Sequence, residues 1–241
     1  MDLQLSLVDG QRQLILEEHD FYLEQFSARV LSQLRDIGGE ADRLTNAEYE
    51  RLGALPGDGS KSLDEIAEEA MERGQTLYGL LSVLRKQMIL GALAGLYHQW
   101  DKELREFIER EIRSDIGSAE AARVWELKGF QMIDLLAKIG WDCRSCPFIP
   151  RIEACGLIVN VYKHGRGRSL DELSQRFPEY LDDGFPEPPG RRSFVDHEWL
   201  SISEEQLKEI ALALRSFWEA FPARLYLEES SPNLASLLQE P

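Results

Sequence analysis

Apolar positions recur at helical spacing through most of the chain. Between Leu14 and Leu34 they recur at roughly helical spacing, and Gly38-Gly39 closes this first predicted helix. The stretch from Ser62 to about Arg113 contains no proline. Because about 50 residues would extend roughly 75 Å as one straight helix, we expect two packed helices there, with a bend or break at Gly74 or Gly79.

Further helices follow in the second half of the chain. They are expected at 130–139, from the Pro147–Pro150 region to Gly165, from Ser169 to about Phe177, and from Ser203 to Phe221. Serine followed three residues later by glutamate predicts capping boxes that begin at Ser62 and Ser169. The pattern therefore predicts an all-α bundle of about six or seven helices, with a small extended element near residues 193–201.

A chain of 241 residues lies between one large domain and two small ones. We expect one helical domain over residues 1–229. Within it, the turn-forming residues near 54–62 predict a flexible loop, and the prolines near 180–192 predict an irregular crossover. Residues 230–241 form a C-terminal tail without a core pattern.

Composition narrows the class of protein. The hydrophobic share of 43% and the charged share of 29% are those of a folded globular chain. The residues after Met1 lack the basic leader of a signal peptide, and the most apolar stretch, Met88 to Tyr97, is shorter than the roughly 20 residues that a bilayer requires. Three cysteines without an export signal indicate reduced thiols. We therefore expect a cytoplasmic protein with no membrane association.

The net charge of −16 restricts the partners. A surface this acidic repels phosphate backbones and anionic lipids, so nonspecific binding of nucleic acid by the whole protein is not expected. Any contact with RNA or a nucleotide has to use a local basic patch. Two are visible, one made of Lys163, Arg166 and Arg168, and the other of Arg191-Arg192.

The segment around His164 carries the most suggestive chemistry. Asn160 and His164 are four residues apart, so they share one face of the helix that ends at Gly165. Lys163, Arg166 and Arg168 surround the histidine with positive charge, and an imidazole titrates near neutral pH. This set suits the proton transfers of RNA phosphodiester cleavage. A structural role stays open, because cations also favour the negative end of a helix dipole.

Asn160-x3-His164 near the end of a late helix in an all-helical protein resembles the motif of the HEPN (higher eukaryotes and prokaryotes nucleotide-binding) superfamily. The resemblance implies a metal-independent endoribonuclease of a toxin–antitoxin or phage-defence system, which needs no cofactor. It implies His164 as the catalytic acid or base and Asn160 as its polar neighbour. Lys163, Arg166 and Arg168 would contact the phosphates. The protein would form a homodimer, and a separate partner protein would be encoded nearby.

Val159 occupies the position where the family motif has its arginine. That arginine is thought to bind the scissile phosphate, and valine has neither charge nor hydrogen-bond donors. Two explanations stay open. Either Arg166 or Arg168 substitutes from the other side of the histidine, or catalysis has been lost and a binding role remains.

Other functions are open as well. The acidic surface suits a noncatalytic interaction module or an antidote that engages a basic partner. Cys143-x2-Cys146 has the spacing of zinc and redox sites, but a zinc site would need Cys155 and His164 as further ligands. His19 lies between carboxylates, which suits a histidine that they hold on a helix surface. His98 and His197 also lie beside acidic or aromatic residues, and all three histidines are read as structural. Phosphate-binding loops, dinucleotide fingerprints and serine nucleophile motifs are absent from the sequence, so we expect neither metal nor cofactor.

Overall fold

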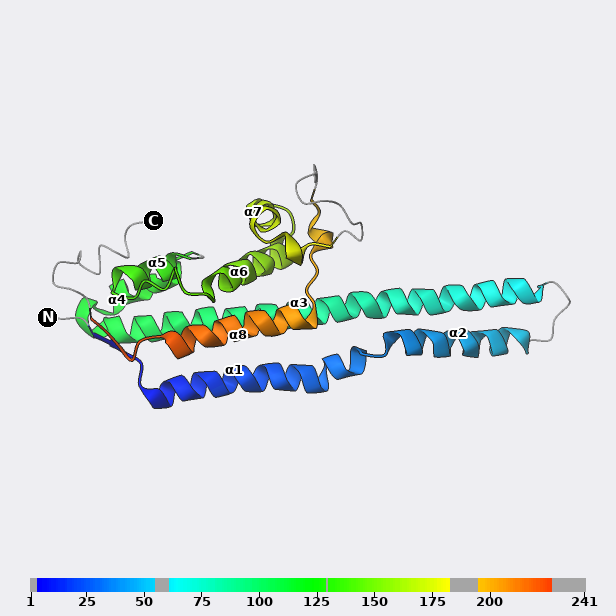
Figure 1. The fold of residues 1–241 in the computed structure, drawn as a ribbon, viewed down its shortest axis with the longest axis horizontal. Helices are drawn as coiled ribbons and strands as arrows, with labels where there is room; N and C mark the ends of the chain where they lie inside the picture. The colour runs from blue at the N-terminus through cyan, green and yellow to red at the C-terminus, as the bar shows by residue number, and fades with distance from the viewer. Residues whose placement is uncertain (1–3, 55–60, 129, 183–194, 227–241) are drawn as a thin grey trace. The chain divides into compact units, whose positions relative to one another are not determined.

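The computed structural model describes residues 4–54, 61–128, 130–182 and 195–226 (Figure 1). The α-helices are α1 Asp9–Arg29, α2 Ile37–Gly53, α3 Leu63–Ile116, α4 Ser118–Ala121, α5 Gln131–Lys138, α6 Ile149–His164, α7 Arg168–Arg176 and α8 Glu204–Ala220. The 3-10 helices are η1 Leu31–Leu34, η2 Ala122–Glu126, η3 Pro178–Tyr180 and η4 His197–Trp199, and the strands are β1 Gln4–Ser6 and β2 Arg224–Tyr226. Within the described residues, seven α-helices have eight or more residues, which confirms the all-α class.

The chain divides into two compact units. The terminal unit comprises Met1–Leu23 and Leu90–Pro241, and the inserted unit comprises Glu24–Ile89. The predicted loop near 54–62 and the crossover near 180–192 lie mostly outside the described residues, and the tail at 230–241 lies wholly outside them.

The terminal unit has an aromatic core on α8. Leu207, Ile210, Leu214 and Phe217 recur at helical spacing on this helix, and all of them are buried. The ring of Phe217 meets that of Trp100 on α3 edge-on, with 5.1 Å between their centroids. Edge-to-face pairs of this kind add to the stabilisation that burial of the rings provides. The α8 pattern was readable from the sequence, but its aromatic partners were not.

α3 is a single uninterrupted helix of 54 residues, so the expected break at Gly74 or Gly79 is wrong. Two glycines cost about 1 kcal/mol each in a helix, and the surrounding glutamate, leucine, arginine and alanine favour helix strongly enough to offset them. Gly74 is needed for packing, since a side chain there would collide with the hydroxyl of Thr45 on α2. A glycine that permits close approach was misread as a bend.

The first predicted helix is wrong at its end. α1 stops at Arg29, and Gly38-Gly39 lie in the first turn of α2. The carboxylate of Asp36 caps α2 by accepting a hydrogen bond from the Gly39 N–H at 3.2 Å. A side chain at position 39 would collide with that carboxylate, so the glycine helps to begin a helix that the sequence did not predict.

The two predicted capping boxes have different outcomes. Ser62 with Glu65 forms both reciprocal hydrogen bonds, which confirms that prediction. Ser203 with Gln206 forms the same pair of bonds at the start of α8. The one at Ser169 is wrong, because α7 begins at Arg168 after Gly167 and has no side-chain cap.

β1 and β2 pair as a two-stranded antiparallel sheet, in which Leu5 lies opposite Leu225. Within the predicted extended element near 193–201, the chain forms η4. Leu200 then makes an isolated antiparallel bridge with Leu181. The segment after the crossover, at Leu200, thus pairs with the residue that follows η3, Leu181.

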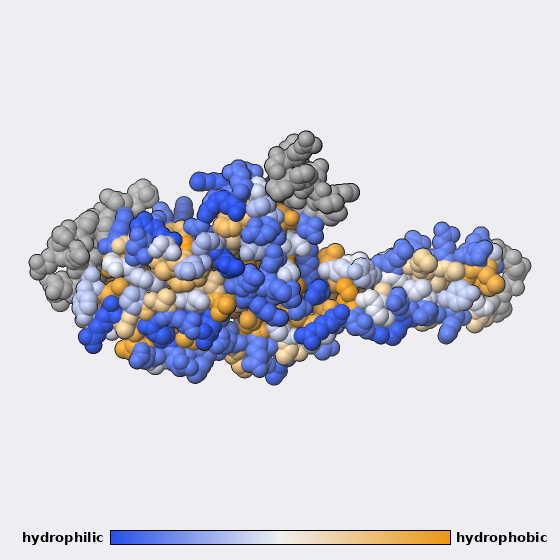
Figure 2. Space-filling view, in the orientation of Figure 1, coloured by the Kyte–Doolittle hydropathy of each residue, from blue (hydrophilic) through white to orange (hydrophobic). Residues whose placement is uncertain are grey.

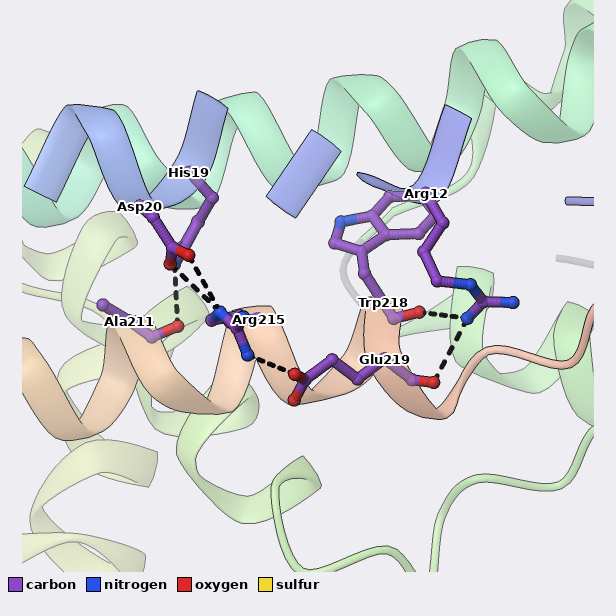
Figure 3. A network of polar contacts seen from close by, with 7 residues as sticks. All are labelled: Arg12, His19, Asp20, Ala211, Arg215, Trp218 and Glu219. Carbon is purple, nitrogen blue, oxygen red and sulfur yellow. Dashed lines mark hydrogen bonds and ion pairs between the residues drawn. The ribbon is translucent and has the colours of Figure 1, made fainter. Parts of the chain in front are cut away.

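Polar contacts join α1 to α8 within the terminal unit (Figure 3). One guanidinium nitrogen of Arg12, Nη1, donates to the carbonyl oxygens of Trp218 at 2.5 Å, Phe221 at 2.6 Å and Glu219 at 3.2 Å. These carbonyls belong to the C-terminal end of α8, where a helix leaves them without an internal partner. A side chain from α1 therefore caps α8.

His19 is the second member of this α1–α8 contact. It is buried, and its Nε2 lies 2.8 Å from the carbonyl oxygen of Ala211 (Figure 3). Burial lowers the pKa of His19 below its ordinary value near 6.5. The sequence reading, a surface histidine held by carboxylates, is wrong, because the partner is a backbone carbonyl.

Among the described residues, α3 alone combines the length and the apolar character that crossing a membrane would require. Its most apolar 18-residue window has a mean hydropathy of 1.3, and 28% of that window is buried. Core helices of soluble proteins pass the same test, so the absence of membrane association stays a prediction.

Candidate functional site

α6 places the segment that the sequence singled out. Pro150 fits the first turn, where its missing N–H is not needed, and Ile152, Cys155 and Ile158 are buried. The helix ends at Gly165, whose φ of +71° favours glycine and whose N–H donates to the Val161 carbonyl at 2.8 Å. The chain turns there and begins α7 three residues later.

The five predicted site residues all lie on the surface at the end of α6 and the start of α7. Asn160 and His164 are exposed on one face of α6, and Lys163, Arg166 and Arg168 are exposed beside them or just after them. The imidazole of His164 is therefore open to solvent rather than packed in the core. Two open grooves found on the described surface are lined by other residues.

The structure brings a second histidine to this place. The ring of His197 lies against Gly165, because a methyl group at that glycine would come within 3.3 Å of its Cδ2. Arg166 Nη2 forms an ion pair with Asp196 Oδ2 at 2.5 Å. We call His164, Gly165, Arg166, Asp196 and His197 the α6–η4 corner.

Asp196 organises the α6–η4 corner. Its carboxylate caps η4 by accepting a hydrogen bond from the N–H of Glu198, and this bond, with the nearby Arg166, keeps the pKa of Asp196 below its usual range. Nδ1 of His197 lies 2.9 Å from Oδ1 of Asp196, although the two atoms are not aligned as a hydrogen bond. The carboxylate therefore places a negative charge beside the imidazole ring.

Val159 does not face the corner. Its side chain is only 3% exposed and belongs to the buried face of α6. The position of the family arginine therefore points into the core of the terminal unit. The guanidinium nearest to His164 along the chain is that of Arg166, on the far side of Gly165.

The cysteines do not assemble a ligand set. Cys143 and Cys155 are buried, and burial raises the pKa of the Cys143 thiol to about 12 and raises that of Cys155 as well. Cys146 is partly exposed. Within the described residues, no three histidine, cysteine or acidic side chains are grouped so that they could hold a metal ion.

Sequence reasoning missed the contacts of His197 with Gly165 and of Asp196 with Arg166. The run Asp196-His197-Glu198 was visible, but a crossover without periodicity separates it from α6 by about 30 residues, so nothing indicated where it would return. Gly165 leaves room for the ring, but the end of α6 already accounts for a glycine there, so it gave no signal for His197. Arg191-Arg192, the second basic candidate, lies outside the described residues.

No protein-family model, no curated protein and no solved structure matches this chain. The resemblance to the HEPN superfamily therefore stays a prediction that rests on the residues around Asn160 and His164.

Proposed function

We propose that the protein acts on RNA or a related nucleotide, with metal-independent acid–base chemistry at the α6–η4 corner. The observation that carries the proposal is the packing of His197 against Gly165, the residue that follows His164, with Asp196 beside the ring. Cleavage of RNA needs one group to accept a proton and another to give one, and the proposal assigns these tasks to His164 and His197.

The proposed reaction uses the 2′-hydroxyl of the RNA itself. One imidazole takes the proton of that hydroxyl as its oxygen bonds to the adjacent phosphorus. The other imidazole gives a proton to the 5′-oxygen as the phosphorus–oxygen bond to it breaks. A 2′,3′-cyclic phosphate and a 5′-hydroxyl result, and no metal or oxidant takes part.

Each residue of the site has a role in this scheme. His164 and His197 exchange the protons, and Asn160 orients His164 as its neighbour one turn earlier. Lys163, Arg166 and Arg168 contact the phosphates, where guanidinium groups suit phosphate geometry best. In an otherwise acidic protein, these cations give the nucleic acid one local place to bind. Homodimerisation, a partner encoded nearby and a role in defence are parts of the same proposal that rest on the HEPN resemblance.

The test is cleavage of a labelled RNA by the purified protein in the presence of a chelator. We expect a 2′,3′-cyclic phosphate product, and we expect both His164→Ala and His197→Ala to abolish its formation. His98→Ala is the matched control, because His98 is an exposed histidine of α3 in the same unit. A DNA strand of the same sequence lacks the attacking hydroxyl and should stay intact. Cleavage of the DNA, or full activity of both site variants, would refute the mechanism.

A noncatalytic interaction role is the second candidate. It is favoured by the net charge of −16 and by the large apolar side chains that α3 exposes. Under this alternative, the wild-type protein and both histidine variants all leave the RNA uncut.

A further inference from the structure

An open groove runs between α2 and α3 within the inserted unit. Its volume is about 480 Å³, which falls in the range of ligand-binding clefts. The residues that line it are Leu44, Glu69, Glu72, Arg73, Thr76, Leu77 and Leu80. The groove is distinct from the α6–η4 corner and shares no residue with it.

Leu44, Leu77 and Leu80 provide the apolar floor of the groove. The two helices approach closely at Gly74, where an added methyl group would come within 3.0 Å of the Ala41 carbonyl oxygen on α2. Leu80 is 65% exposed. Single exposed leucines are ordinary, but a run of them is typical of an interaction surface.

The run continues along α3 beyond the groove. Leu77, Leu80 and Leu84 are spaced by three and four residues, so they lie along one side of the helix, and Val83 and Met88 are exposed as well. Figure 2 shows hydrophobic patches among hydrophilic atoms over the part of the surface formed by α2 and the first half of α3.

The charge beside the groove is negative. Residues 63–72 of α3 contain Asp64, Glu65, Glu68, Glu69 and Glu72 and no basic residue. Lys61 pairs with Glu69 at 2.6 Å, and Arg73 lies 3.8 Å from Glu48, which leaves an excess of carboxylates at this end. Anionic lipids and nucleic acids are repelled by such a rim, whereas a cationic partner is attracted.

We propose that this groove is a docking site for an amphipathic helix of another protein, whose apolar face is flanked by lysine and arginine. Helices that dock in grooves place apolar anchors at positions i, i+3 or i+4, and i+7, which matches the spacing of the leucines that receive them. The anchors fill the floor beside Leu77 and Leu80, and the basic flank meets Glu69 and Glu72. The groove would be the binding site of the noncatalytic interaction role, and this proposal does not depend on the RNA chemistry.

A designed peptide tests this proposal on the full-length protein. The probe is a labelled 14-residue helix of leucine and lysine in a heptad pattern, and its binding is followed by fluorescence anisotropy. We expect the peptide to bind, and we expect its affinity to fall as the salt concentration is raised, because salt screens part of the electrostatic attraction. The same pattern built with glutamate in place of lysine should not bind. A scrambled leucine–lysine peptide should bind only weakly.

Matched variants locate the site. Leu80→Ser and Glu72→Gln should each weaken binding by roughly tenfold or less, the scale of about 1.4 kcal/mol for one contact. Leu14→Ser is the apolar control, since Leu14 is 55% exposed on α1 in the other unit, and Glu17→Gln is the charge control. Circular dichroism checks that all four variants fold.

Two outcomes overturn the proposal. If the groove variants and the control variants bind the peptide with equal affinity, the peptide recognises only the net charge of the protein. Concentration-dependent self-association that Leu80→Ser abolishes, measured by sedimentation, would assign the groove to a second copy of the chain instead. Neither outcome bears on RNA cleavage, which is measured with the histidine variants.

Discussion

Replacing Arg12 with methionine removes the cap that α1 provides for α8. Methionine keeps an unbranched chain of similar length, so most of the packing survives while the charge and the donors are lost. Three carbonyl oxygens, those of Trp218, Glu219 and Phe221, then lose a cationic donor that two of them contact at 2.5 and 2.6 Å. The change therefore isolates the polar part of the contact.

The expected magnitude follows from the geometry. A hydrogen bond from a charged donor contributes about 1.5–3 kcal/mol. A cation at the C-terminal end of a helix adds about 0.3–1 kcal/mol. Because Nη1 has only two hydrogens for three carbonyls, the bonds are shared and not additive, and we expect a total loss of about 2–4 kcal/mol.

Urea unfolding at pH 7 measures this loss, as a lower midpoint with an unchanged slope. The melting temperature should fall by roughly 5–15 °C for a chain of this size. Arg113→Met is the control, because Arg113 pairs on the surface of α3 with Glu109 and such pairs contribute about 0–1 kcal/mol. An Arg12→Met protein as stable as the Arg113→Met protein would refute the capping role.

Three further outcomes are expected. Burial lowers the pKa of His19, so the folded state binds fewer protons than the unfolded state. The stability that His19 contributes is therefore intact above about pH 6.5 and is lost as the pH falls through the folded pKa. The urea midpoints at pH 8 and pH 5 should differ less for His19→Gln than for the wild-type protein. Gly74→Ala should destabilise the inserted unit, whereas Gly79→Ala, which has open space around it, should stabilise α3 by roughly 0.5–1 kcal/mol. Hydrogen exchange of the α3 amides should become faster in the first variant and slower in the second, and the same change in both would contradict the packing at Gly74. A thiol reagent should modify Cys146 quickly and Cys155 only after unfolding. Rapid reaction of both thiols in the native protein would contradict the burial of Cys155.

The fold was predictable where local rules decide it. The serine caps of α3 and α8 and the stop of α6 at Gly165 depend on neighbours within a few residues, and the sequence shows them directly. The continuity of α3 and the existence of α2 were not predictable. In both places a glycine that makes room for another group, Thr45 in one case and Asp36 in the other, looks the same in sequence as a glycine that ends a helix.

The candidate site was predictable only in its α6 half. The spacing of Asn160 and His164 fixes their common face, because helical geometry relates residues four apart. Asp196 and His197 reach the corner through tertiary packing after a crossover without periodic pattern, and no local rule gives the position at which such a segment returns.

The division of the chain has a consequence for biosynthesis. The inserted unit is one contiguous stretch, so its helices can meet as soon as they leave the ribosome. The terminal unit needs both of its flanking segments, since β1 cannot pair with β2 until residues 224–226 have been made. During translation β1 therefore waits for its partner strand, and Leu5 and Leu7, which are buried in the folded chain, stay unshielded in that interval.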